Sequence, residues 1–119
     1  MRHMSFALTT TQVRNQTKTV TRRLGWQFLK PGDLVQPVVK AQGLRNGEKL
    51  EKIGSPVRIV SIRREPLNAI TLDDCEREGF KGNTETEFVS MFCREMDCAA
   101  DAEVTRIEFT YTAPGAAAG

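Results

Sequence analysis

The most polar stretch of the sequence covers residues 17–23 and reads Thr-Lys-Thr-Val-Thr-Arg-Arg. It holds three hydroxyls and three cations, and Val20 is its one apolar residue. Lysine and arginine bind phosphate through charge-assisted hydrogen bonds, and a threonine hydroxyl becomes a nucleophile when a base takes its proton. The stretch therefore indicates an anion- or nucleotide-binding site. A solvated edge strand guarded by charged residues gives the same pattern, and composition alone slightly favours that second interpretation.

Short strands must hold this stretch in place. Residues 17–24 are themselves rich in β-branched side chains and predict a strand that ends at Gly25. A short helix is predicted over residues 12–15, and Asn46-Gly47 is typical of a hairpin turn. The same patterns predict further strands over residues 5–8, 34–41, 56–63 and 103–112.

Two helices are predicted between Pro66 and the last strand. Thr71 and Asp74 form a Thr-x-x-Asp cap for the first helix, which ends at Gly79. Thr84 and Glu87 form a capping box for the second helix, whose apolar residues recur at helical spacing from residue 88 to residue 96. Because strands come first and helices precede the last strand, we expect an α+β fold with a mixed or antiparallel sheet.

Composition narrows the domain organisation and the possible chemistry. A chain of 119 residues with 39% hydrophobic and 27% charged residues predicts one folded domain, here residues 1–112, with a disordered tail over 113–119. Three cysteines without a Cys-x-x-Cys pair argue against a disulfide framework or a cysteine zinc site, and a single histidine argues against a His-rich metal site. We expect no cofactor. With no membrane span or secretory signal recognised, we expect a cytoplasmic monomer.

The charge is divided unevenly along the chain. Residues 1–64 hold 13 Lys or Arg and 3 Asp or Glu, whereas residues 65–119 hold 4 basic and 12 acidic residues. A basic surface facing an anion is one interpretation, with nucleic acid as the usual partner. The other interpretation is that the two halves pack together, so that Arg22 and Arg23 pair with Asp73, Glu76 or Glu78 inside the fold.

The segment Lys18–Arg23 resembles the Lys-Thr-x-Thr-x-Arg segment of ASCH domains, which belong to the PUA-like superfamily. Lys30-Pro31-Gly32-Asp33 resembles the Gly-Asp turn that follows it there, and the two helices and an Ile107-Glu108-Phe109 strand come in the same order. The resemblance covers most of residues 5–112. It implies a small mixed β-barrel with two or three flanking helices that binds RNA or a nucleoside.

One branch of that family is the bacterial N4-acetylcytidine amidohydrolases. The resemblance to them implies that Lys18 is a proton acceptor, Thr21 a nucleophile and Glu78 a proton donor. The chain differs from the branch in having Arg22 where an aliphatic residue is usual, and in a segment over residues 42–55 that resembles an insertion.

The chemistry sets two conditions on these residues. The pKa of Lys18 must fall, through burial or neighbouring cations, before Lys18 can accept a proton at neutral pH. In a regular strand residues 18 and 21 point to opposite faces, so a turn or bulge near Lys18 is required. Glu78 is expected at the boundary of its helix, where Glu76 is an alternative acid.

Nucleic acid would be bound by Lys18, Arg22, Arg23 and the aromatic face of Trp26. The alternative, that Trp26 and Phe28 form a core plug beneath the barrel, is favoured because buried aromatic residues dominate small cores. The alternatives to an amidohydrolase are an RNA-binding module without turnover and a protein-binding accessory factor that uses the acidic half of the chain.

Overall fold

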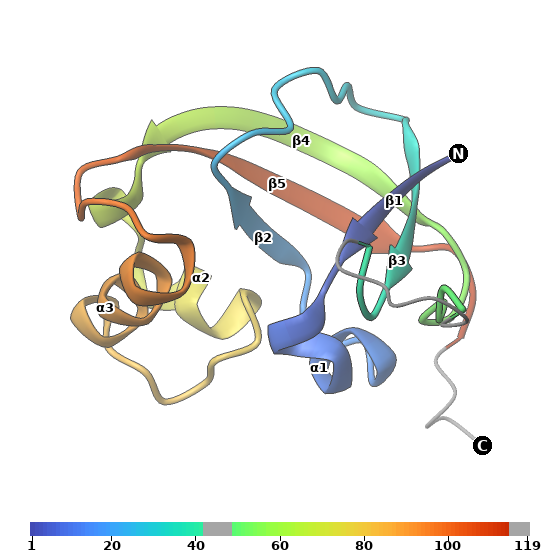
Figure 1. Ribbon diagram of the computed structural model, residues 1–119, viewed down its shortest axis with the longest axis horizontal. Coiled ribbons are helices and arrows are strands. Elements are labelled where there is room, and N and C mark those ends of the chain that lie inside the picture. The colour runs from blue at the N-terminus through green and yellow to red at the C-terminus, as the bar shows by residue number, and fades with distance from the viewer. Residues whose placement is uncertain (42–48, 115–119) are drawn as a thin grey trace.

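Five strands form one sheet in the order β1-β3-β4-β5-β2 in the computed structural model of the protein, which describes residues 1–41 and 49–114 (Figure 1). β1 runs parallel to β3, and every other neighbouring pair is antiparallel. The predicted Asn46-Gly47 hairpin and most of the predicted tail lie outside the described residues. The strands are β1 (Arg2–Ser5), β2 (Val20–Arg23), β3 (Leu34–Val38), β4 (Val57–Pro66) and β5 (Glu103–Tyr111).

The mixed α+β fold agrees with the prediction from the sequence, but the sheet is not closed. β1 and β2 are its two outer strands, each four residues long, whereas β4 has ten residues and β5 has nine. Within the described residues β1 and β2 do not pair with each other. The barrel is therefore partial, and the gap between β1 and β2 is an open seam.

The first predicted strand, over residues 5–8, was wrong. β1 ends at Ser5, and a 3₁₀ turn (Ala7–Thr9) leads into helix α1 (Thr10–Arg14). The Phe6 carbonyl accepts hydrogen bonds from the Thr9 amide, at 3.1 Å, and the Thr10 hydroxyl, at 2.8 Å. Because these local bonds satisfy the backbone in a helical turn, the apolar residues after Ser5 do not extend the strand.

The strand predicted over residues 17–24 is shorter in the structure, because the chain turns before it. Gln16 has a positive φ of 63°, and the amides of Thr17 and Lys18 both donate to the Gln12 carbonyl. Regular pairing with β5 starts only at Val20. A turn or bulge near Lys18 was the predicted condition for Lys18 and Thr21 to face the same side, and this turn is such a departure from strand geometry.

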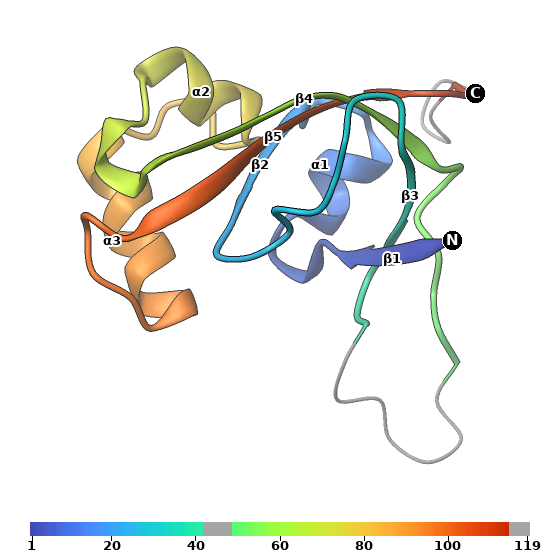
Figure 2. The same ribbon diagram turned by 90° about the horizontal axis from the view of Figure 1, so that it is seen from above.

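Helices α2 (Leu72–Arg77) and α3 (Glu85–Met96) begin at the predicted caps. The Thr71 hydroxyl accepts a hydrogen bond from the Asp74 amide, and Thr84 and Glu87 form both hydrogen bonds of a capping box. A second 3₁₀ turn (Leu67–Ala69) precedes α2. Figures 1 and 2 show α2 and α3 together at one end of the long strands β4 and β5, with α1 farther along the sheet. No helix in the described part of the chain is long and apolar enough to span a membrane.

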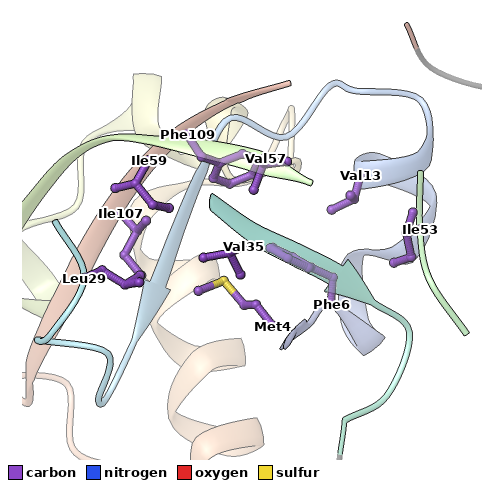
Figure 3. Packing of buried hydrophobic residues seen from close by; sticks show 10 residues of the cluster. All are labelled: Met4, Phe6, Val13, Leu29, Val35, Ile53, Val57, Ile59, Ile107 and Phe109. Atoms are coloured by element: carbon purple, nitrogen blue, oxygen red, sulfur yellow. The ribbon is translucent and has the colours of Figure 1, made fainter. Parts of the chain in front are cut away.

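Two apolar clusters fill the interior. The larger one lies between the sheet and α1 and includes Phe6, Val13 and Phe109 among the ten residues of Figure 3. The smaller one joins α2 and α3 to the ends of β4 and β5 through six buried residues. These six are Leu67, Ile70, Cys75, Phe88, Phe92 and Val104. The candidate site lies where the two clusters meet.

Candidate functional site

A cavity of about 260 Å³ opens between the end of β1, strand β2 and helix α3. Its polar wall is made by Ser5, Thr21, Arg23 and Glu78, together with Arg22 and Thr9. Its apolar wall is made mainly by the aromatic and methionine side chains that follow α2 or lie on α3: Phe80, Phe88, Met91, Phe92 and Met96. Small-molecule sites typically measure about 300–1,000 Å³, so this cavity is suited to a ligand as small as a nucleobase.

Lys18 and Glu78 form a buried ion pair at this cavity. The Lys18 Nζ donates to Glu78 Oε1 at 2.7 Å and to the Glu78 carbonyl at 2.8 Å, and both side chains are about 3% exposed. Burial lowers the pKa of Lys18, and the attraction of Glu78 only partly opposes this shift. Lys18 itself is not among the lining residues, so it lies behind Glu78 as seen from the cavity.

Arg22 occupies the second oxygen of the Glu78 carboxylate. Its Nη1 donates to Glu78 Oε2 at 3.1 Å, and its Nη2 donates to Glu65 at 3.0 Å and also to Asp74. The guanidinium is buried, and its remaining Nε–H has no partner among the described residues. Arg22 is therefore held by carboxylates inside the fold, which is the alternative interpretation given above to binding an external phosphate.

Asp74 and Arg106 complete the network. Arg106 donates to both carboxylate oxygens of Asp74, from Nε at 2.6 Å and from Nη2 at 3.0 Å. Burial raises the pKa of Asp74, but the hydrogen bonds from Arg106 and Arg22 outweigh it and hold the pKa well below its usual value. The buried cations Lys18, Arg22 and Arg106 thus balance the carboxylates Glu65, Asp74 and Glu78.

Thr21 and Arg23 lie on the same face of β2, two residues apart. The Arg23 Nε donates to the Thr21 hydroxyl at 3.3 Å, and the Arg23 guanidinium lies over the Phe6 ring at 4.8 Å. Burial lowers the pKa of Arg23 to about 10, against the attraction of Glu78, so Arg23 stays charged at neutral pH. Unlike Arg22, Arg23 has no carboxylate partner among the described residues.

Backbone contacts fix where Lys18 and Glu78 meet. The Tyr111 hydroxyl donates to the Lys18 carbonyl, and the Thr19 amide donates to the Arg77 carbonyl at 2.8 Å, which ties the Lys18 segment to the end of α2. The chain then turns at Gly79, where φ is +100° and a Cβ would come within 2.8 Å of the Gln12 side chain. Glycine is required there because an L-residue is strained at this angle.

A second cavity, of about 330 Å³, adjoins the first. It is lined by His3, Ser5, Arg23, Trp26, Lys40 and Ala41, and it shares Ser5 and Arg23 with the first cavity. Trp26 packs partly against the larger apolar cluster, with its ring 5.3 Å from that of Phe28. Trp26 therefore has features of both predicted roles, since it contacts the core and also lines a cavity.

The structure brings together some of the predicted site residues and separates others. Lys18 meets Glu78, and Glu78 shares a cavity wall with Thr21 and Arg23. Glu76, the alternative acid, is exposed and lines neither of these cavities.

The sequence did not predict that three residues, Glu65, Asp74 and Arg106, belong to this network. The sequence predicts Asp74 as part of a helix cap, and its backbone amide does donate to the Thr71 hydroxyl. Its side chain, however, accepts hydrogen bonds from Arg22 and Arg106. Among residues 1–41 and 49–114, no cluster of three or more His, Cys, Asp or Glu side chains is placed to hold a metal ion.

Comparison with known proteins identifies the fold. No family model and no curated protein matches the sequence. A crystal structure of a DUF984 protein from Enterococcus faecalis V583 is similar with a TM-score of 0.61 and 13% identity, over 94% of this chain and 76% of that one. The ASCH domain from Lactobacillus crispatus JV V101 is similar with a TM-score of 0.55 and 16% identity, over 92% of this chain and 77% of that one. The chain therefore has an ASCH-like fold, as its resemblance to ASCH domains implied.

Proposed function

We propose that the protein hydrolyses the amide of an N4-acylated cytidine, or of a related N-acyl nucleoside, in the cavity of Thr21 and Glu78. The observation that carries this proposal is the buried Lys18–Glu78 pair, whose carboxylate lines a cavity beside a threonine hydroxyl. Cleaving an amide on an exocyclic amine needs a nucleophile, a base and an acid for the leaving amine. The three side chains supply one group for each task.

The Lys18–Glu78 pair can act as acid and base together. Moving one proton across the 2.7 Å contact converts the ion pair into a neutral amine and a carboxylic acid. Burial lowers the pKa of Lys18 and favours its neutral amine, as do the charges of Arg23 and Arg22, whereas the attraction of Glu78 favours the charged form of Lys18. In the neutral form Lys18 is able to accept a proton and Glu78 is able to donate one.

The proposed reaction then has two steps. The Thr21 hydroxyl attacks the acyl carbonyl and passes its proton to the Lys18–Glu78 pair, while the leaving amine takes a proton from that pair and departs as cytidine. Water next cleaves the threonine ester, releasing the carboxylic acid and restoring the hydroxyl. Arg23, which donates to Thr21 in the resting site, supplies a positive charge beside the oxyanion that forms during attack.

The apolar wall suits the acyl group. Phe80 and the residues of α3 present aromatic rings and methionines opposite the polar wall, and a methyl or longer alkyl group gains by leaving water there. The polar wall then takes the base and its exocyclic nitrogen. An amide lying across the cavity would thus have its carbonyl between Thr21 and Glu78.

A binding role without turnover is the second candidate. It is favoured by the ion pair between Arg22 and Glu78, because a carboxylate that only stabilises the fold would have such a buried partner. In that case the same cavity recognises a base without chemical change. The two candidates differ in whether the Lys18–Glu78 pair exchanges protons with a ligand.

Incubation with N4-acetylcytidine separates the two candidates, with the release of cytidine and acetate followed by chromatography. We expect turnover by the unchanged protein and its loss in Lys18→Met and Thr21→Val, because groups that act as a unit fail together. Thr19→Val is the matched control: Thr19 belongs to the same motif, but its hydroxyl bonds Arg77 and does not line the cavity. Full activity in folded Thr21→Val, or none in the unchanged protein, would reject the amidohydrolase.

A further inference from the structure

Both cavities border the open seam between β1 and β2, since each is lined by residues of both strands. Ser5, the last residue of β1, and Arg23, the last residue of β2, line both of them. A ligand confined to the first cavity would occupy only one of them. A ligand with a second unit of similar size, joined through a short linker, would occupy both cavities.

The second cavity differs in chemistry from the first. Among the described residues that line it there is no carboxylate, and it combines the cations Arg23 and Lys40 with His3 and the ring of Trp26. Nearby, the half-exposed Phe28 ring lies 5.3 Å from Trp26 and carries the Arg2 guanidinium 4.1 Å above its face. Aromatic faces beside cations are the pattern that binds single-stranded nucleic acid, since rings stack bases and cations meet phosphates.

Two further observations point to a ligand at this place. Trp26 has a φ of 68°, a left-handed conformation that is uncommon for a bulky residue and is held only where surrounding structure fixes it. Arg23 uses its Nε for Thr21, and its two terminal nitrogens have no hydrogen-bond partner among the described residues. A charged guanidinium at the boundary of two cavities is therefore free to bind an anion.

We infer that the ligand is a nucleotide within a single-stranded nucleic acid, and not a free nucleoside. The target base occupies the first cavity and the neighbouring base stacks on Trp26 in the second. The phosphate between them binds Arg23 at the seam, and Lys40 meets the next phosphate. This inference rests on the proposed function for the base in the first cavity. The second cavity is the reason to infer a polymer and not a free nucleoside.

Trp26 is the single tryptophan of the chain, so its fluorescence reports on the second cavity directly. We would titrate the protein with cytidine and with a five-nucleotide RNA that has cytidine at its centre, and repeat the titration with the matching DNA. The RNA should quench Trp26 and bind at least about tenfold more tightly than cytidine, the effect of one stacked base and one bound phosphate. Cytidine should leave the emission nearly unchanged.

Two lysines provide a matched pair of variants. Lys40 lines the second cavity, whereas Lys30 is also exposed, precedes the other end of β3 and lines neither cavity. Both Lys40→Ala and Lys30→Ala remove one charge, so net charge affects them equally. Lys40→Ala should weaken RNA binding and reduce the slope of log affinity against log salt by about 0.7, whereas Lys30→Ala should match the unchanged protein. Trp26→Ala should weaken binding of labelled RNA, and Trp26→Phe should restore most of it.

The outcomes separate this inference from the function on which it rests. Hydrolysis of free N4-acetylcytidine, together with equal affinity for cytidine and RNA and no quenching, would overturn the inference and leave the amidohydrolase standing. Quenching and tight RNA binding without turnover of an acetylated five-nucleotide RNA would support the polymer site and reject the enzyme. Tighter binding of DNA than of RNA would keep the second cavity but reassign its ligand to DNA.

Discussion

Replacing Asp74 by asparagine tests whether the buried network holds the fold together. Asp74 accepts one hydrogen bond from Arg22 and two from Arg106, and its side chain is about 6% exposed. The asparagine side chain would keep one acceptor oxygen, but it would leave two buried guanidiniums without their shared countercharge. Removing one partner of a buried ion pair costs about 3–5 kcal/mol.

That cost is large beside the total stability of a domain, which is about 5–15 kcal/mol. For a chain of this length 1 kcal/mol shifts the melting temperature by roughly 4 °C, so Asp74→Asn should melt about 12–20 °C lower. Asp73→Asn is the control, because Asp73 is the exposed neighbour in the same first turn of α2. It removes the same net charge and a similar interaction with the helix dipole, so the difference between the variants isolates the buried contacts.

Thermal and urea unfolding of both variants, followed by circular dichroism, give the measurement. We expect Asp73→Asn within about 0.5 kcal/mol of the unchanged protein, as for most surface substitutions. If the two variants unfold within about 1 kcal/mol of each other, the network is not a determinant of stability. The charges of Arg22 and Arg106 would then have to be solvated or to form ion pairs with other groups.

Three further predictions concern the same region. Because the folded pKa of Asp74 is depressed, its contribution to stability should be complete above about pH 4 and fall as the pH drops below that value; acid titration of Asp74→Asn should show less of this loss. Gly79→Ala should destabilise by roughly 1–3 kcal/mol in urea unfolding and reduce turnover, since its Cβ meets Gln12 at a left-handed φ and displaces Glu78. Tyr111→Phe should cost about 0.5–1.5 kcal/mol in the same assay, the value of the hydrogen bond to the Lys18 carbonyl.

Local signals in the sequence predicted the helices well. The Thr71 cap and the Thr84–Glu87 capping box form as expected, because the groups of a cap lie within four residues of one another. The first strand was misplaced because the Phe6 carbonyl takes part in a helical turn, and apolar residues beside it fit either structure. The resemblance implied the architecture of the fold, but it implied a barrel, whereas β1 and β2 do not pair with each other among the described residues.

The sequence predicted only part of the ion-pair network: it offered a pair between Arg22 and Glu78 as one alternative, but not the roles of Glu65, Asp74 and Arg106. Arg22, Glu65, Asp74 and Arg106 come from β2, β4, α2 and β5, and nothing local indicates that these elements meet. Lys18 was linked to Glu78 through the resemblance, and its required turn was foreseen from strand geometry. The pairing of Arg22 with Asp74 needed the register of β2 on β5, which places Arg22 opposite Arg106 and so calls for a carboxylate between two cations.

The balance of the network constrains the chemistry of Lys18. Apolar residues of similar volume often stabilise a core as well as buried ion pairs do, so stability alone does not account for these charges beside a cavity. Because the three cations and three carboxylates of the network sum to zero, adding or removing a proton at Lys18 alone changes the net charge of the network. The net charge of the network stays the same when Glu78 gains a proton as Lys18 loses one, or loses a proton as Lys18 gains one. In the hydrolysis that we propose, the pair of Lys18 and Glu78, and not either residue alone, would therefore be the unit that exchanges protons with the amide.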